Sequence, residues 1–407
     1  MDPYDHRMLG PRLDLFHQQE EGPGAAFWHP RGARLYRMIE SYIHGQMRRA
    51  GFNEVRTPQL LAKSLWERSG HWAKFGPHMF VFTDGERNFA LKPMNCPGHV
   101  QLFRERIRSY RDLPLRLCEF GACHRYEPSG ALHGLMRARA FTQDDAHVFC
   151  MPEQVDAEVS AFCQLLRRIY ARFGFHDVIV GFSTRPAQRE GSDAIWDRAE
   201  AALAAAGTAA GLRFRMQPGE GAFYGPKLEF ILQDRDGREW QCGTIQLDLV
   251  LPEKLGAEAI NPAGSAVRPV LIHHAVLGSF ERFIAVLLEH HRGKLPFWLA
   301  PDQVMVAPLS AAQAGYARCI AERFEAGAVR CVVEDANVTL ARRIVLAHEQ
   351  AIPVLAIAGP REMAAGSVTL RHGAGRQQAY TIEQAAAWLN GLAASGAEPA
   401  ATIGAAG

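Results

Sequence analysis

The sequence predicts an α+β protein, with an antiparallel sheet domain over residues 1–297 and a small α/β domain over residues 298–393. In the first part, a long helical pattern precedes short strand blocks that are joined by hairpin-type turns such as Asp84-Gly85 and Asp236-Gly237. In the second part, apolar blocks of four to seven residues alternate with helical patterns, which is typical of a small α/β domain with a mostly parallel sheet. A Pro-rich aromatic segment, KLPFWLAP, separates the two parts.

The individual elements follow from the spacing of apolar residues. Helical spacing covers residues 33–49 and again the apolar segment 278–291, GSFERFIAVLLEHH. In the second part, strand blocks begin at residues 304, 329, 353 and 367, and helical patterns cover residues 312–327, 339–350 and 382–394. The Ala/Gly-rich end, 394–407, is expected to be disordered.

Composition excludes several classes of protein. The net charge is only +2 over 407 residues, so any surface for nucleic acid must be local. The N-terminus has no apolar segment typical of a secretory signal, and no stretch approaches the roughly 18 apolar residues of a membrane span. The eight cysteines are scattered, without a C-x-x-C pair, and indicate reduced thiols in a cytoplasmic protein.

The run 113–147, LPLRLCEFGACHRYEPSGALHGLMRARAFTQDDAH, predicts two strands joined by a loop. Arg125 and Glu127 follow the first strand, Arg137 opens the return strand, and Phe141 comes four residues later. A nucleoside triphosphate requires a guanidinium for its α-phosphate, a carboxylate and an aromatic face for its base, and a second cation for its phosphate tail. An ordinary hairpin with surface salt bridges would explain Arg125 and Glu127, but not the whole run.

The order Arg-x-Glu, loop, Arg-x-x-x-Phe resembles motif 2 of the class II aminoacyl-tRNA synthetases, and the surrounding residues resemble the threonyl-tRNA synthetase version. GFNEVRTP, which ends at Pro58 after the long helix, is similar to motif 1, which builds the dimer interface in this class. GSFERF, with Gly278, Glu281 and Arg282, is similar to motif 3, whose arginine holds the γ-phosphate of ATP. The resemblance covers nearly the whole chain and implies the class II antiparallel catalytic fold followed by an anticodon-binding domain.

The resemblance also implies one zinc ion per chain, held by Cys96, His147 and His273. One thiolate and two imidazoles leave a fourth coordination position open, as in catalytic zinc sites. Spacing alone would not predict this site, because a lone Cys or His in an apolar block is usually a packed core residue. All three residues, however, match ligand positions of the family. His274 is an alternative to His273, but the family position is the first of the pair.

An open zinc position would distinguish threonine from valine, because threonine can offer both its amino nitrogen and its hydroxyl to the metal. A site built to bind a hydroxyl can reject an analogue that lacks it by roughly 10⁴-fold or more. The resemblance places Asp145 near the ammonium group of the amino acid, and His71 at a position linked to transfer onto tRNA. The remaining positions that line the amino acid site in the family are Gln143, Tyr224, Gln241 and Gln246.

The implied reaction is the formation of threonyl-adenylate from threonine and ATP with Mg²⁺, followed by transfer to the 3′ end of tRNA(Thr). Arg125 and Arg282 would act in catalysis, with Glu127, Arg137 and Phe141 completing the ATP site. The small domain would bind the anticodon through Asn337, Glu362 and Arg371, although Ala336 stands where the family usually has another basic residue.

Residues 33–58 are expected to form a homodimer interface. The chain begins at the catalytic core, so we expect it to lack the family's N-terminal editing region and to form Ser-tRNA that it does not hydrolyse. Three other functions remain open: activation of threonine for a non-tRNA acceptor such as a carrier protein, an inhibitor-resistant duplicate synthetase, or a non-catalytic regulator that binds tRNA or amino acid. The last is least favoured, because the arginines of motifs 2 and 3 are both present.

Overall fold

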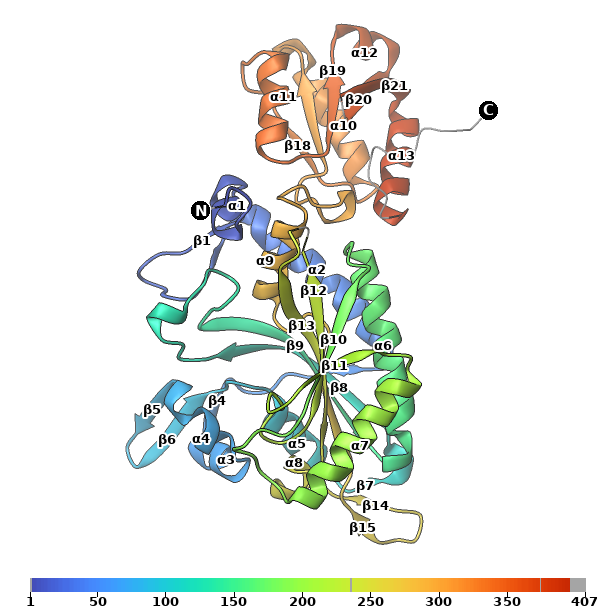
Figure 1. The fold of residues 1–407 in the computed structure, drawn as a ribbon. Coiled ribbons are helices and arrows are strands. Elements are labelled where there is room, and N and C mark those ends of the chain that lie inside the picture. The colour runs from blue at the N-terminus through green and yellow to red at the C-terminus, as the bar shows by residue number, and fades with distance from the viewer. Residues whose placement is uncertain (1, 235, 374, 396–407) are drawn as a thin grey trace. The chain divides into compact units, whose positions relative to one another are not determined.

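The computed structural model describes residues 2–234, 236–373 and 375–395, and the fold consists of two compact units (Figure 1). The first unit comprises Gln18–Ala25 and Glu40–Val286. The second comprises the described residues of Met1–His17, Ala26–Ile39 and Leu287–Gly407. The domain boundary expected after residue 297 stays a prediction.

The first unit is built on an eight-stranded sheet with the strand order β11-β10-β12-β13-β16-β9-β8-β3. Neighbouring strands are antiparallel, except for the parallel pairs β10–β11 and β8–β3 at the two edges, so the predicted antiparallel sheet is confirmed. The strands are β3 (Asn53–Glu54), β8 (Leu115–His124), β9 (Ala140–Cys150), β10 (Val178–Ser183), β11 (Phe214–Gln217), β12 (Lys227–Gln233), β13 (Glu239–Asp248) and β16 (Val270–Ala275).

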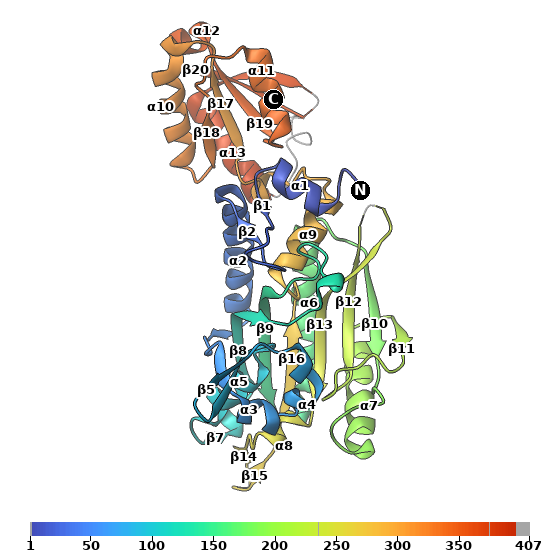
Figure 2. The same ribbon diagram turned by 90° about the vertical axis from the view of Figure 1, so that its left-hand side faces the viewer.

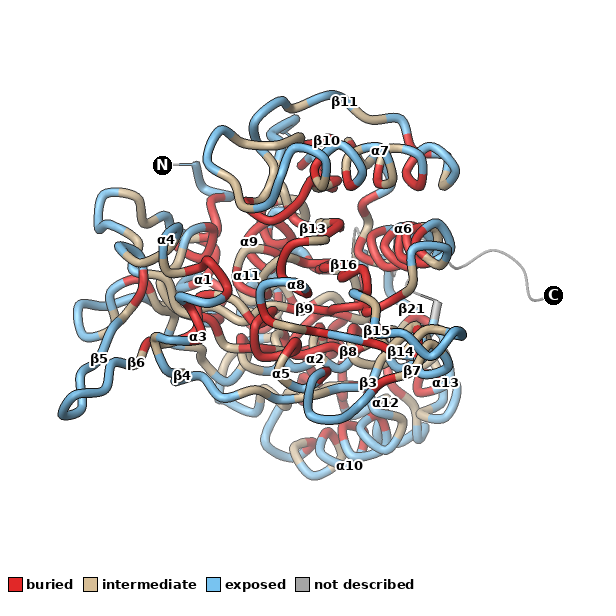
Figure 3. Tube along the Cα trace, turned by 90° about the horizontal axis from the view of Figure 1, so that it is seen from below, coloured by how far each residue is buried: buried red, intermediate tan, exposed pale blue. Residues whose placement is uncertain are grey.

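Helices cover the sheet and bury its central strands. Helices α6 and α7 pack against each other, and α7 also contacts β12 and β13 (Figures 1 and 2). Every residue of β16 is buried, and burial is concentrated in the central strands (Figure 3). The helices that lie wholly or partly in this unit are α2 (Pro30–Arg49), α3 (Lys63–Arg68), α4 (His71–Phe75), α5 (Cys96–Arg104), α6 (Val155–Arg172), α7 (Asp193–Ala209), α8 (Leu251–Lys254) and α9 (Phe280–His290).

Both predicted hairpins are present. Gly85 adopts a φ of +58° between β5 and β6, a left-handed conformation that glycine adopts without strain. Between β12 and β13, the Asp234 carboxylate accepts hydrogen bonds from the amides of Asp236 and Arg238 and so closes the turn. Two small sheets complete the unit, one with β4 (Leu60–Ala62), β5 (Val81–Asp84) and β6 (Arg87–Leu91), the other with β7 (Arg108–Ser109), β14 (Ala259–Ile260) and β15 (Ala266–Val267).

The second unit contains a five-stranded sheet with the order β18-β17-β19-β20-β21. The sheet is mixed: β18, β17 and β19 pair in parallel as predicted, whereas β20 and β21 are added through antiparallel pairing. β21 has a polar and largely exposed sequence, RQQAYT, which carries no apolar strand signal. The strands are β17 (Val304–Pro308), β18 (Cys331–Val333), β19 (Val354–Ala358), β20 (Ser367–His372) and β21 (Arg376–Thr381).

Helices pack on both faces of this second sheet. Residues of α10 and α13 share one apolar cluster with the sheet, and residues of α11 share another. Ser395 ends α13, so the predicted disordered tail begins too early, and its residues 396–407 lie outside the described residues. The remaining elements are α1 (His6–Arg12), β1 (Phe16–His17), β2 (Phe27–Trp28), α10 (Ala314–Glu325), α11 (Leu340–Glu349), α12 (Pro360–Ala365) and α13 (Ile382–Ser395).

Two features predicted from composition can be compared with the fold. Within the described ranges, no helix is long and apolar enough to cross a membrane. The described residues include all eight cysteines, and every one of them is a free thiol.

Candidate active site

The candidate site begins at the hairpin of β8 and β9, the two strands predicted for residues 113–147. Their pairing places Cys123 opposite Phe141 and Gly121 opposite Gln143. Arg125 follows the last residue of β8, and Phe141 is the second residue of β9. The register therefore brings the guanidinium and the aromatic ring to the same end of the hairpin.

A cavity of about 390 Å³ lies beside this end of the hairpin. Its walls come from β9, β13, the loop between β8 and β9, and the start of α9. Eight residues predicted from the sequence line it: Arg125, Glu127, Arg137, Phe141, Gln143, Gln241, Gln246 and Arg282. The structure thus brings together every residue proposed for ATP and three of the five proposed for the amino acid.

Arg125 is held in a defined orientation at the cavity. Its guanidinium lies over the Phe141 ring, 5.0 Å from the centroid, and its Nε donates a hydrogen bond to the Pro93 carbonyl at 3.2 Å. A cation above an aromatic face is attracted by the negative face of the ring. This contact presents a positive charge next to an aromatic surface, as a nucleotide requires.

Arg282 enters the cavity from the first turn of α9. Its Nη1 donates to the Gln241 carbonyl at 3.3 Å, whereas its buried Nε has no hydrogen-bond partner among the described residues. A buried donor without an acceptor destabilises the protein by about 1–3 kcal/mol. A phosphate oxygen in the cavity would supply that acceptor.

The loop that leads into α9 is fixed by β9. The buried Asp144 carboxylate accepts hydrogen bonds from three consecutive amides, those of Val276 and Leu277 at 2.8 Å and that of Gly278 at 3.0 Å. Burial raises the pKa of Asp144 to about 7, and the amides of Leu277 and Val276 act in the opposite direction. The amides favour the ionised carboxylate, which accepts all three bonds at once.

Two further contacts fix the beginning of α9. The Glu281 carboxylate accepts a hydrogen bond from the Thr142 amide of β9 at 2.9 Å. Gly278 has a φ of +82°, and a Cβ atom there would lie 2.5 Å from the Cys242 carbonyl oxygen. Only glycine fits such a close approach, and the position of Arg282 therefore depends on the sheet beneath it.

Glu127 and Arg137, both proposed for ATP, form an ion pair with each other. The Nε and Nη2 atoms of Arg137 lie 2.9 and 2.8 Å from Glu127 Oε2. The Arg137 side chain is 56% exposed, so water screens the pair and it contributes little to stability. A nucleotide would need to open this pair, which its weakness permits.

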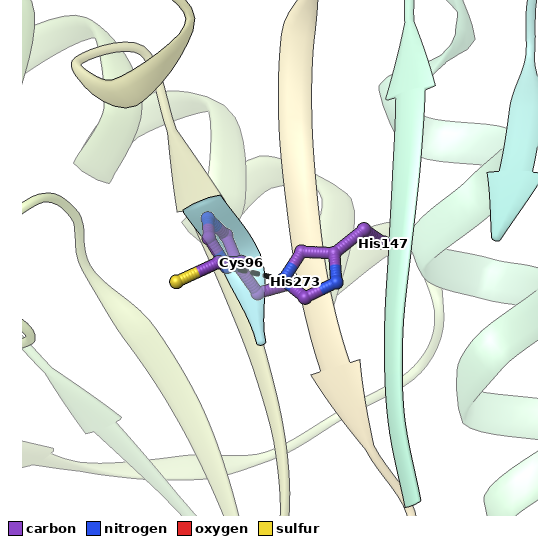
Figure 4. Close-up of side chains that lie close together, drawn as sticks. All are labelled: Cys96, His147 and His273. Atoms are coloured by element: carbon purple, nitrogen blue, oxygen red, sulfur yellow. Dashed lines mark hydrogen bonds between the residues drawn. The ribbon is translucent and has the colours of Figure 1, made fainter. Parts of the chain in front are cut away.

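Cys96, His147 and His273 lie together in the first unit (Figure 4). Their ligand atoms all lie within 4.8 Å of one another, and all three side chains are buried. Antiparallel pairing of β9 and β16 places His273 directly opposite His147, and Cys96 is the first residue of α5. One sulfur and two imidazole nitrogens form a donor set that fits zinc.

His274, the alternative ligand, lies away from this group. Its ring packs against Phe52, 5.1 Å between centroids, and against Phe162 at 4.4 Å. Consecutive residues of a strand point to opposite faces, so only one of the two histidines can face His147. The geometry favours His273.

Tyr224 connects the Cys/His group to the cavity. Its ring stacks on His273 with centroids 4.7 Å apart, and its hydroxyl donates to Gln246 Oε1 at 2.6 Å. Asp145 accepts a hydrogen bond from Asn95 Nδ2 at 3.1 Å, and burial raises its pKa. A cation beside Asp145 would stabilise its ionised form, which is consistent with the expected ammonium group.

His71 is completely buried beside Cys96 and does not line the cavity. Its Nε2 lies 3.3 Å from Cys96 Sγ, and its Nδ1 lies 2.9 Å from Ser69 Oγ. Burial lowers the pKa of His71 to about 3, so the ring is neutral. The role in transfer onto tRNA that the resemblance implies for His71 stays a prediction.

The three residues proposed for the anticodon do not gather at one point. Asn337 follows β18 and Glu362 follows β19, so both lie at the carboxyl edge of the parallel strands. Arg371 on β20 pairs with Leu355, near the opposite end of β19. Glu362 also accepts hydrogen bonds from the Gly359 amide and the Thr369 hydroxyl, which gives it a structural role.

Sequence reasoning missed most of the residues that support these groups. Asp144 and Asp248 lie inside strands, and nothing in their spacing predicts which backbone amides or rings they contact. His99 and Glu119 lie on different elements, and only the fold brings them together. The signal that the sequence did offer for these residues was a polar side chain within a largely apolar segment, and all four are buried in the structure.

Comparisons with known proteins agree with this geometry. Residues 80–291 match the family model described as the tRNA synthetase class II core domain (G, H, P, S and T), and residues 303–392 match the anticodon binding domain. A solved structure of the RNA binding domain of threonyl-tRNA synthetase from Cryptosporidium parvum Iowa II is 39% identical, with a TM-score of 0.92. That match covers 98% of this chain and 99% of the other.

Curated relatives named threonine–tRNA ligase are more similar in sequence. The protein from Cupriavidus pinatubonensis is 54% identical over 367 residues, which cover 90% of this chain and 58% of the relative. The protein from Paramagnetospirillum magneticum is 52% identical over 387 residues, which cover 95% of this chain and 61% of the relative. The chain therefore spans about three fifths of the length of these relatives.

Proposed function

We propose that this chain, which belongs to the class II tRNA synthetases and within them to the threonyl-tRNA synthetase family, activates threonine with ATP and transfers it to tRNA(Thr). The observation that supports this most directly is the cavity lined by Arg125, Phe141 and Arg282. Gln246 of β13 lines the same cavity and pairs in register with His273 of β16, so the cavity and the Cys/His group lie on neighbouring strands.

In the first step, a carboxylate oxygen of threonine attacks the α-phosphorus of ATP, and the bond to the β-phosphate oxygen breaks to release pyrophosphate. Arg125 stabilises charge at the α-phosphate, while Arg282 holds the γ-phosphate and closes the adenine site opposite Phe141. Glu127 accepts a hydrogen bond from the adenine edge, and Arg137 binds the phosphate tail. Catalysis by such residues consists of positioning and electrostatic stabilisation, and Mg²⁺ would neutralise phosphate charge.

Cys96, His147 and His273 would hold one zinc ion, which when bound supplies a Lewis-acid position for the amino and hydroxyl groups of threonine. Asp145 binds the ammonium group, and Gln143, Gln241, Gln246 and Tyr224 shape the rest of the pocket. In the second step, a hydroxyl of the 3′-terminal ribose attacks the threonyl carbonyl and AMP leaves. His71 is proposed to act in this second step, the transfer onto tRNA.

Three further proposals concern the whole protein. The match of residues 303–392 to an anticodon-binding domain supports tRNA as the acceptor, with Asn337, Glu362 and Arg371 as candidate contacts. The assembly is a homodimer formed through residues 33–58. The cytoplasmic location and the absence of editing, both expected from the sequence, stay predictions.

A paired assay tests the proposal. Threonine-dependent exchange of pyrophosphate into ATP measures the first step, and charging of purified tRNA(Thr) measures the second. Exchange together with charging is expected. Exchange without charging would favour a non-tRNA acceptor, and loss of both activities in zinc-loaded protein would favour a non-catalytic regulator.

A further inference from the structure

The buried carboxylate of Asp248 forms a hydrogen bond with the His273 ring of the Cys/His group. His273 Nε2 lies 2.8 Å from Asp248 Oδ2, while Asp248 Oδ1 accepts hydrogen bonds from the Val250 and Leu251 amides at 2.7 and 2.9 Å. A carboxylate can only accept, so His273 Nε2 must carry the proton. In the neutral ring, Nδ1 then offers a lone pair toward His147.

The other ring of the group, that of His147, is linked to Glu119 through a longer chain of hydrogen bonds. Glu119 Oε2 lies 3.1 Å from His99 Nε2, and His99 Nδ1 lies 2.9 Å from His147 Nδ1. Burial raises the pKa of Glu119, but hydrogen bonds from His99 and Lys92 outweigh this effect and place it at about 2. Glu119 is therefore an acceptor, and His99 carries its proton on Nε2.

The tautomer of His147 follows from that of His99. In its neutral form, His99 presents a lone pair at Nδ1, which can only accept, so His147 then donates from its own Nδ1. His147 Nε2 is then left with a lone pair that faces His273 Nδ1 at 2.9 Å. Two lone pairs at this distance repel each other unless a cation or a proton lies between them.

We propose that Asp248 and His99 are positioning residues that fix the tautomers in which His273 Nδ1 and His147 Nε2 both point lone pairs at one metal ion. Lys92 and Thr57 anchor the far end of the chain by donating to Glu119 at 2.8 and 2.9 Å. Tetrahedral zinc would separate the two nitrogens by about 3.4 Å, only slightly more than their present distance. The inference rests on the proposed zinc site.

Asp248→Asn is the sharpest variant. The remaining oxygen can keep the Val250 and Leu251 amides, while the new NH₂ group faces His273 Nε2 and forces the proton onto Nδ1. Zinc affinity, measured with zinc alone by competition against a chromophoric chelator, should fall about 10–100-fold. Asp234→Asn is the matched control, because Asp234 is also buried and also accepts turn amides, but in the distant β12–β13 hairpin.

His99 offers a second, independent pair of variants. Leu at position 99 removes the acceptor for His147, whereas Asn can replace Nδ1 with its side-chain oxygen. Zinc affinity should therefore fall in His99→Leu and recover, at least in part, in His99→Asn. A purely structural role for His99 would instead lower the thermal stability of both variants without separating their zinc affinities.

The tautomers can also be read in the zinc-loaded wild-type chain, where the metal ion removes the repulsion between the two lone pairs. Long-range ¹⁵N–¹H correlation on histidine-labelled protein should show the Nδ1–H form of His147 and the Nε2–H form of His273. The opposite tautomer at either residue, or unchanged zinc affinity in both Asp248→Asn and His99→Leu, would overturn the inference. If the wild-type chain takes up no zinc, the proposed metal site itself fails, whereas zinc uptake with the opposite tautomer at either residue contradicts only this inference.

Discussion

At the scale of single residues, the proposed nucleotide site depends on two arginines that reach one cavity from different elements. Arg125 comes from the end of β8 and Arg282 from the start of α9, and each is oriented by a bond to a backbone carbonyl. The sequence could identify both arginines because each belongs to a compact motif. It could not show that the Nε of Arg282 is buried with no partner within the described part of the chain, since that depends on the packing around α9.

Replacement of either arginine by alanine should slow adenylate formation while the protein stays folded. Removing a single preorganised donor from a site where charge develops typically lowers kcat by roughly 10²–10³-fold. Threonine-dependent pyrophosphate exchange measures the loss. Arg215→Ala removes an exposed ion pair with Glu239 and should leave the rate unchanged. Near-normal exchange in Arg125→Ala or Arg282→Ala would contradict the motif assignment.

Cys96→Ser should abolish stoichiometric zinc, because a serine hydroxyl is a much poorer zinc ligand than a thiolate. Elemental analysis after gel filtration gives the metal content, and pyrophosphate exchange gives the effect on threonine activation. Cys163→Ser, at a buried cysteine of α6, is the matched control and should keep its zinc. Full activity in a zinc-free Cys96→Ser protein would refute a role for the metal.

At the scale of elements, the helical start of α9 is coupled to β9 through carboxylates. The Asp144→Asn variant should leave one of three buried amides facing an NH₂ group, which costs about 1–3 kcal/mol. We expect a lower thermal midpoint and a raised KM for ATP, because the loop at 276–278 positions Arg282. Asp197→Asn, an exposed carboxylate on α7, is the control. An unchanged KM for ATP would show that the loop holds its position without Asp144.

The sequence predicted those elements whose signal is local. The β8–β9 pair, α2, α9 and the alternating elements of the second unit all have clear apolar periodicity, and they were found within a few residues of their true ends. β21 and α12 were missed because one is polar and exposed and the other has only six residues. The register that places His273 opposite His147 was beyond the sequence, since it depends on the pairing of strands more than 100 residues apart.

At the scale of the whole molecule, the assembly is predicted to be a two-fold homodimer. Leu60 and Phe82 are about half exposed and lie on the same face of the sheet β4-β6-β5, whose first strand follows the motif 1 segment. Two large apolar side chains exposed on one face are consistent with a surface that a second copy of the chain covers. Light scattering at micromolar concentration should give the mass of a dimer. Phe82→Asp should weaken it, whereas Val345→Asp, an exposed position on α11, should not. An active wild-type monomer would contradict this prediction.

Serine should be activated at a measurable rate. It keeps the amino and hydroxyl groups of threonine and lacks one methyl, and a single methyl supports discrimination of only about 10–200-fold. The ratio of kcat/KM values for threonine and serine in pyrophosphate exchange tests this. A ratio above roughly 10⁴ would show that the pocket senses the methyl group by a mechanism other than packing. Hydrolysis of preformed Ser-tRNA by the purified chain would refute the expected absence of editing.

The direct opposition of His147 and His273 in the sheet has a consequence for how this protein can change by insertion and deletion. Side chains alternate along a strand, so one residue added to β16 before His273 would turn the following side chains to the other face. The imidazole would leave the Cys/His group, and the buried apolar residues of the same strand would enter packing on the opposite face that is shaped for other side chains. Length variation should therefore be tolerated in connecting segments that line no site, such as the exposed turn between β5 and β6, and be absent from β9 and β16.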